Sequence, residues 1–148
     1  MKKIIMFVLS LILLMSCATK ISDLKSNPEK YVGEIVKVRG NVNKLVKIPF
    51  TDYSFLEIGD DTDNILVFTL KEHEKNEVIT MSVKVVGFDS SNPEKSTKSV
   101  IDSIEKFILD NIKIDESKVK KTAEVVGSTI SKALNASNAT YFLIEQEK

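Results

Sequence analysis

The feature that most constrains the fold is one long alternating stretch, EIVKVRGNVNKLV, at residues 34–46. Val36, Val38 and Val42 share one parity, whereas polar side chains occupy most of the other. Such alternation predicts a half-buried β-strand with one wet face. Gly40 interrupts the pattern in its middle, where we expect a bulge or a sharp bend. A strand that bends there can serve two sides of a small barrel.

Further stretches of strand character follow, separated by turn signals. They cover residues 53–59, 64–70 and 78–88, and a last one covers 139–145. The acidic residues 60–63 between the first two indicate a hairpin turn. The first four strands at this spacing predict a small antiparallel barrel or sandwich.

Two helices are expected between the fourth and the last strand, within residues 97–135. Ser96 or Thr97 could cap the first helix and Asp115 the second. Gly127 weakens the second helix by about 1 kcal/mol relative to alanine, so we expect a bend there. The apolar stripes are formed by Val100, Ile101, Ile104, Phe107, Ile108 and Ile112, and by Val119, Ala123, Val126, Ile130 and Leu134.

Two segments resemble the OB-fold of small exported bacterial proteins: NPEKYVGEIVKVRGNV at 27–42 and FTDYSFLEIGDDTDNILVF at 50–68. The resemblance implies a mainly β, α+β domain built as a five-stranded antiparallel Greek-key barrel. The helix often found between strands three and four is missing, and two helices are inserted between strands four and five instead. This helical pair either caps the barrel or forms a partner surface.

The N-terminus has the character of an export signal. Lys2 and Lys3 precede an apolar run of about eleven residues, whereas a membrane-spanning helix needs roughly 20. The stretch LMSC at 14–17 resembles the lipobox of bacterial lipoproteins. That resemblance implies cleavage before Cys17 and a diacylglycerol on its sulfur. The alternatives are an ordinary signal peptide with an incidental cysteine, or an uncleaved anchor.

The expected organisation is a signal peptide at 1–16, a lipidated tether at 17–20 and a single OB-like domain at 21–148. The expected place is the cell envelope, held to the membrane by lipid on Cys17. Ala18, where an aspartate would retain such a protein at the inner membrane, favours the outer membrane in a Gram-negative lineage. Because Cys17 is the only cysteine, disulfides cannot stabilise the domain.

Charge argues against a nucleic-acid partner. Removal of residues 1–16 takes two of the 21 lysines and arginines and none of the 21 acidic residues, which leaves a formal charge of −2. Proteins that bind nucleic acid usually carry a basic excess.

One constellation fits the ligand face that OB-folds use on strands two and three. Lys37 and Arg39 lie on the first strand, and Phe50 and Tyr53 lie on or before the second. Together they could stack on a sugar or base, or accept an extended peptide. The alternative is that Lys37 and Arg39 only keep the outer face wet and that the neighbouring aromatic side chains belong to the core.

No catalytic set, cofactor site or metal site is expected. His73 lies in a charged connection, KEHEKNE at 71–77, and we expect it to be solvated because no further metal ligands align with it. The acidic turn at 60–63 lacks the loop and the terminal glutamate of an EF-hand, so we interpret it as conformational.

The sequence therefore predicts a non-catalytic binding or assembly module that takes a peptide or protein segment, a saccharide or a small ion. The alternative is an accessory structural subunit of an envelope complex that docks through the helices at 97–135. A hydrolase would require a cleft with clustered carboxylates.

Overall fold

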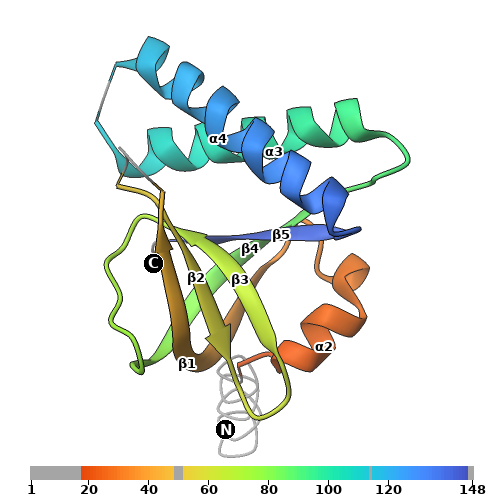
Figure 1. The fold of residues 1–148 in the computed structure, drawn as a ribbon, viewed down its shortest axis with the longest axis vertical. Helices are drawn as coiled ribbons and strands as arrows, with labels where there is room; N and C mark the ends of the chain where they lie inside the picture. The colour runs from red at the N-terminus through yellow and green to blue at the C-terminus, as the bar shows by residue number, and fades with distance from the viewer. Residues whose placement is uncertain (1–17, 49–51, 114, 147–148) are drawn as a thin grey trace, which may run out of the picture.

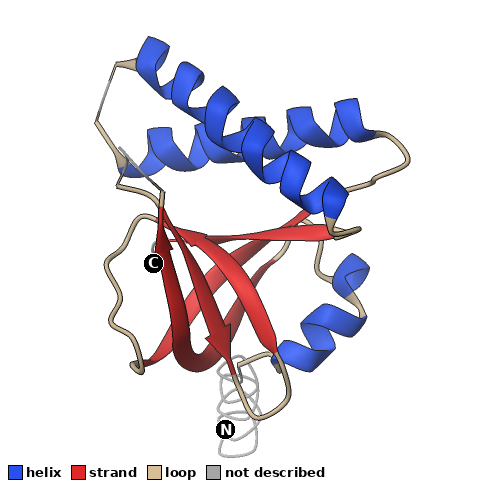
Figure 2. Ribbon diagram, viewed as in Figure 1, coloured by secondary structure: helices blue, strands red, loops and turns tan. Residues whose placement is uncertain are grey.

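The computed structural model describes residues 18–48, 52–113 and 115–146. Five strands close into a barrel in the order β1-β2-β3-β5-β4, and two long helices separate β4 from β5 (Figures 1 and 2). The strands are β1 (Ile35–Lys47), β2 (Ser54–Gly59), β3 (Asn64–Thr69), β4 (Val78–Gly87) and β5 (Tyr141–Gln146). The helices are α2 (Ile21–Ser26), the short 3₁₀ helix η1 (Pro28–Lys30), α3 (Pro93–Asn111) and α4 (Glu116–Ala136).

The predicted OB-like α+β fold is confirmed, with one correction to its strand directions. β3 and β5 run parallel through Val67 and Phe68, whereas every other pair is antiparallel. The reason is geometric: a closed ring with an odd number of strands cannot alternate direction throughout, so at least one pair must be parallel. A barrel that is antiparallel throughout was therefore the wrong expectation.

β1 serves two sides of the barrel, as its glycine predicts. Its first half, from Ile35 to Asn41, pairs with β4, and the half after Asn41 pairs with β2. A Cβ atom at Gly40 would lie 2.6 Å from the carbonyl oxygen of Gly59, so only glycine fits where the bent strand approaches β2. The register shift follows just after, between Val42 and Lys44.

The buried side chains form two clusters on opposite sides of the barrel wall. One fills the barrel and is closed by Ile21 and Leu24 of α2. The other lies outside the wall, where the helical pair covers β3, β4 and β5. Its largest contributions come from Phe68, Val86, Phe88, Phe142 and Ile144 of the barrel side and from Val100, Ile104, Phe107, Ile108, Val119, Val126 and Ile130 of the helices.

α3 begins earlier than predicted. Its N-cap is Asn92, and Pro93 occupies the first turn, where its missing N–H costs nothing. Ser96, expected as a cap, is buried and exchanges two hydrogen bonds with the backbone of Asp89 (2.9 and 3.1 Å). The expectation was wrong because the Asn-Pro pair is the stronger start signal.

α4 begins as predicted, with the Asp115 carboxylate accepting from the Ser117 N–H at 2.8 Å. The helix is continuous through Gly127, where a bend was expected. A Cβ atom there would lie 2.6 Å from Cγ1 of Ile101 and 3.0 Å from its Cα. Gly127 therefore allows the two helices to approach closely. No helix in the described part of the chain is long and apolar enough to span a bilayer.

Candidate functional site

The predicted ligand residues do not share one surface. Lys37 and Arg39 are exposed on the outer face of β1. Tyr53 is only 5% exposed, and its ring stacks on Phe68 with centroids 5.4 Å apart. Burial, and secondarily the negative charge of Asp52, raises the pKa of the Tyr53 phenol. Phe50 lies outside the described residues.

The helical pair covers Phe68 of β3, and the half-buried Phe55 of β2 packs against the same cluster. Phe68 is fully buried and contacts Phe107 of α3 at 5.9 Å between ring centroids. It also contacts Phe55 at 5.8 Å and Phe142 at 6.0 Å. The helices therefore occupy the Phe68 end of the face that OB-folds use for ligands, while Leu66 on the same face of β3 stays 58% exposed.

Basic side chains gather on a different part of the barrel, the outer face of β1 and β4. Strand register places Arg39 opposite Thr80, Lys37 opposite Ser82, and Ile35 opposite Lys84. Successive pairs on one face of a sheet lie about 7 Å apart. Arg39, Lys37 and Lys84 therefore follow one another along this face.

Helix α3 continues the same basic surface. Lys95, Lys98 and Lys106 project from it and, together with Lys84, line a concavity of about 390 Å³. The same concavity is lined by Ser99, Asp102 and Ser103, so a single acidic residue lies among the lysines. We define the basic band as Lys37, Arg39, Lys84, Lys95, Lys98 and Lys106.

No member of the basic band forms an ion pair with another described side chain; the ion pairs among the described residues involve Lys25, Lys71 and His73. Lys95 acts on the Asp89 carboxylate only at longer range, where its charge contributes to lowering the pKa of Asp89 after the hydrogen bonds from Ser91. Two exposed apolar side chains flank its strand portion: Ile35 is 59% exposed and Val78 is 63% exposed. The band is therefore an open cationic surface with apolar edges.

Two of these six residues, Lys37 and Arg39, were predicted from the sequence. The helical spacing of Lys95, Lys98 and Lys106 was visible as a signal, because residues three, eight and eleven apart lie near one face of a helix. Their approach to Lys84 follows only from how α3 packs on the barrel.

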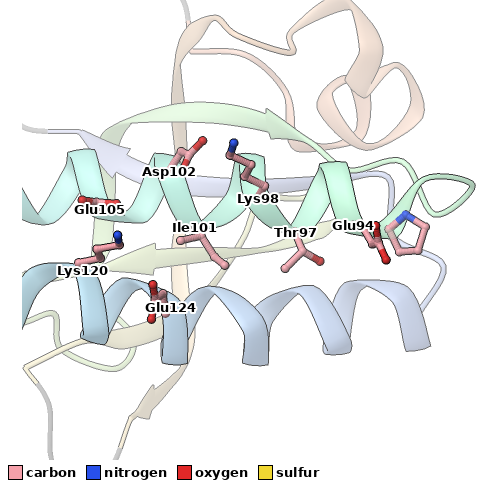
Figure 3. A pocket seen from close by; sticks show the side chains of 9 residues that line it. Glu94, Thr97, Lys98, Ile101, Asp102, Glu105, Lys120 and Glu124 are labelled. Carbon is pink, nitrogen blue, oxygen red and sulfur yellow. The ribbon is translucent and has the colours of Figure 1, made fainter.

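A second concavity, of about 730 Å³, lies between α3 and α4 (Figure 3). Ile101 points from α3 toward α4, whereas Lys98 and Asp102 project from another side of α3. This acidic groove is lined by Pro93, Glu94, Thr97, Lys98, Ile101, Asp102, Glu105, Lys120 and Glu124. Its balance of charge is thus the reverse of that in the basic band.

His73 was expected to be a solvated loop histidine, and this expectation was wrong. Its side chain is 11% exposed, and Nε2 lies 3.2 Å from Oε2 of Glu145, which is 6% exposed. The same oxygen accepts a hydrogen bond from the Thr69 hydroxyl at 2.5 Å, and Lys71 Nζ lies 3.4 Å from Oε1. A buried carboxylate needs such partners. His73 is therefore held against the barrel by Glu145, which lies 72 residues further along the chain.

The start of the domain is fixed to the barrel. The Thr19 N–H donates to the Lys37 carbonyl at 2.7 Å, beside Val38 of β1. The Ile21 N–H donates to the Asp60 carboxylate at 3.0 Å. The chain is therefore part of the fold from its second described residue onward.

The acidic turn is structural, as interpreted from the sequence. Partial desolvation acts to raise the pKa of Asp60, but it is outweighed by hydrogen bonds from the Thr62 hydroxyl and from the backbone N–H groups of Ile21, Thr62 and Asp63. They lower this pKa to about 2. Asp63 pairs with Lys25 of α2 at 2.7 Å. These contacts tie α2 to the hairpin.

No protein-family model, curated protein or solved structure matches this chain. Its function is therefore inferred from its own residues.

Proposed function

We propose that this chain is a lipid-anchored protein of the cell envelope, at the outer membrane in a Gram-negative lineage, and that it acts as a non-catalytic binding or assembly module. The anchor is supported by the apolar N-terminal run that ends in LMSC at 14–17. The observation that carries the proposal is the distance from that cysteine to the domain: Thr19, two residues after Cys17, is already hydrogen-bonded to β1. Lipid on Cys17 would hold the barrel directly at a bilayer.

The basic band supports a binding role better than docking through the helices does. Exposed apolar side chains stand beside Lys37 and Arg39, which is the arrangement expected of a ligand surface. By contrast, the apolar stripes of α3 and α4 are largely buried against each other and against the barrel. The exposed large apolar residues of the two helices are Leu109 and Val125. The accessory-subunit hypothesis is thus the less favoured one.

A non-catalytic role is supported by the position of the only histidine. His73 Nε2 faces the Glu145 carboxylate, and that carboxylate also holds the hydroxyl of Thr69. The Thr69 hydroxyl in turn accepts from the Lys71 N–H at 2.9 Å. These contacts close the end of β3 against β5. They do not aim a base at a nucleophile.

The anchor is tested with Cys17→Ser in cells labelled with a radioactive fatty acid. We expect the variant to carry no lipid label and to remain an uncleaved precursor, because the modified sulfur is gone. Met15→Leu is the matched control and should stay labelled. Lipid label on Cys17→Ser would contradict the anchor.

The binding role is tested by gentle detergent extraction of the intact lipoprotein followed by mass spectrometry of whatever co-purifies. A ligand lost on Lys37→Glu together with Arg39→Glu, without loss of thermal stability, is the expected result. A protein partner that survives this double change and is lost on substitutions in α3 and α4 would instead establish the accessory subunit.

A further inference from the structure

We propose that the basic band is the surface with which the anchored domain lies against its own membrane, and that its ligand is the anionic headgroup layer of the bilayer. This inference rests on the proposed lipid anchor. It adds a fixed orientation: the side of β1 and β4 faces the lipid, and the acidic groove, which borders the band at Lys98 and Asp102, is left outside the contact.

The chain that leads to Cys17 starts beside the basic band. The Thr19 N–H is bonded to the carbonyl of Lys37, itself a member of the band. Two residues of extended chain span at most about 7 Å, so an acylated Cys17 must lie close to Lys37. The bilayer surface is then close to the strand end of the basic band at any tilt of the domain.

The second step is the shape and length of the band. Arg39, Lys37 and Lys84 follow the strand face, and the α3 lysines extend the band by about 16 Å from Lys95 to Lys106. This is a wide, open surface and not a closed pocket for one small ion. Acyl chains combined with a polybasic patch give a more stable attachment than either signal alone.

The third step is the apolar edge. Ile35 and Val78, both more than half exposed, lie on the same face as Lys37 and Arg39. Apolar side chains beside basic ones suit the boundary between headgroups and acyl chains, where the apolar groups enter and the cations remain with the phosphates.

The fourth step is the distribution of acidic groups around α3. Glu94, Glu105 and Glu124 line the acidic groove, and none of them lines the concavity of the basic band. An anionic bilayer would repel the groove and attract the band, so both surfaces favour the same orientation. At the Arg39 end, Asp60 and Asp61 line the adjoining concavity. The Asp60 carboxylate is engaged by backbone N–H groups of its own turn and of α2, so Asp61 is the acidic group that remains to oppose the band there.

The experiment uses the intact lipoprotein in vesicles. Lipid blocks Cys17, the only cysteine, so a cysteine introduced elsewhere can be labelled selectively with a fluorophore. Thr80→Cys places the label opposite Arg39 on the band, and Lys132→Cys places it on the exposed surface of α4 as the matched control. Quenching by a nitroxide carried near the lipid headgroup reports which label lies at the bilayer.

In vesicles rich in phosphatidylglycerol we expect the Thr80→Cys label to be quenched several-fold more than the Lys132→Cys label. The difference should become several-fold smaller in pure phosphatidylcholine, at high salt, and on adding Lys37→Glu with Arg39→Glu, because the tether alone then holds the domain at the bilayer. Adding Lys118→Glu with Lys121→Glu on α4, an equal change of charge, should leave it intact. Circular dichroism shows that each variant is folded.

Three results would overturn the inference. The first is equal quenching of the two labels in vesicles rich in phosphatidylglycerol, and the second is a difference of the same size in phosphatidylcholine. The third is loss of the quenching of the Thr80→Cys label on adding inorganic phosphate, but not on adding chloride at the same ionic strength. That result would make the band a site for small anions. Mass spectrometry of the Cys17 peptide from the same sample separates these from failure of the anchor: an unlipidated Cys17 overturns the proposed function itself.

Discussion

The outer surface of this barrel has two halves that differ in burial and in charge. On β3 and β5 it is aromatic and aliphatic, with Phe68, Phe142 and Ile144 buried under the helical pair. On β1 and β4 it is basic and open, with Lys37 and Arg39 exposed to solvent. The two helices inserted after β4 therefore cover part of one half and leave the other half exposed to solvent. Which part of the barrel surface stays accessible thus depends on what is inserted between the strands.

The covered half should bear most of the stability. We expect Phe68→Ala to reduce the free energy of unfolding by about 3–5 kcal/mol, because it removes a fully buried ring that contacts four other aromatic rings. Thr80→Ala on the open half should change it by less than about 0.5 kcal/mol. Urea unfolding measures both. Equal effects would mean that the two halves do not differ as described.

The close crossing of the helices gives the next largest effect. Gly127→Ala should destabilise by about 1–3 kcal/mol, since its methyl group would overlap Ile101, although the helix alone would gain about 1 kcal/mol. Ser128→Ala, one residue along the same helix, controls for helix propensity. A stabilised Gly127→Ala variant would show that α3 and α4 do not cross this closely.

The hairpin contacts beside the tether give a smaller effect that depends on pH. Asp60→Asn should cost about 1 kcal/mol at neutral pH, because the amide accepts fewer and weaker hydrogen bonds than the carboxylate. The folded-state pKa of Asp60 is lowered from 3.8 to about 2, so its contribution is present above pH 3.8 and is lost as the pH falls toward 2.

Thermal unfolding between pH 5 and pH 2 tests this contribution. The wild-type protein should lose more stability across that range than Asp60→Asn does. Parallel curves for the two proteins would mean that Asp60 contributes nothing that depends on its charge.

Sequence patterns predicted the elements well because their signals are local. The alternation of β1, the bend at Gly40 and the cap at Asp115 each depend on a few neighbouring residues. The parallel pairing of β3 with β5 is a property of the closed ring, which no single segment carries.

The candidate site was less predictable, because its residues are brought together by tertiary contacts. Tyr53 was expected to be accessible, but its ring packs on Phe68 of β3, which Phe107 of α3 contacts in turn. His73 was expected to be solvated, but it lies against Glu145 of β5. Lys84 joins the α3 lysines only when the helix lies against β4. Lys37 and Arg39 could be singled out because the alternation of their own strand already placed them on the wet face.

The most direct test of the account compares the two surfaces of one unmutated molecule. The full-length protein, carrying the proposed lipid on Cys17, is reconstituted in vesicles rich in phosphatidylglycerol and treated with a lysine-acetylating reagent. The modification of each lysine is measured by mass spectrometry. We expect Lys37, Lys84 and Lys95 to be protected relative to the detergent-solubilised protein, while Lys118, Lys121 and Lys132 of α4 are not. Protection of the α4 lysines with free reaction of the basic band would contradict the proposed orientation.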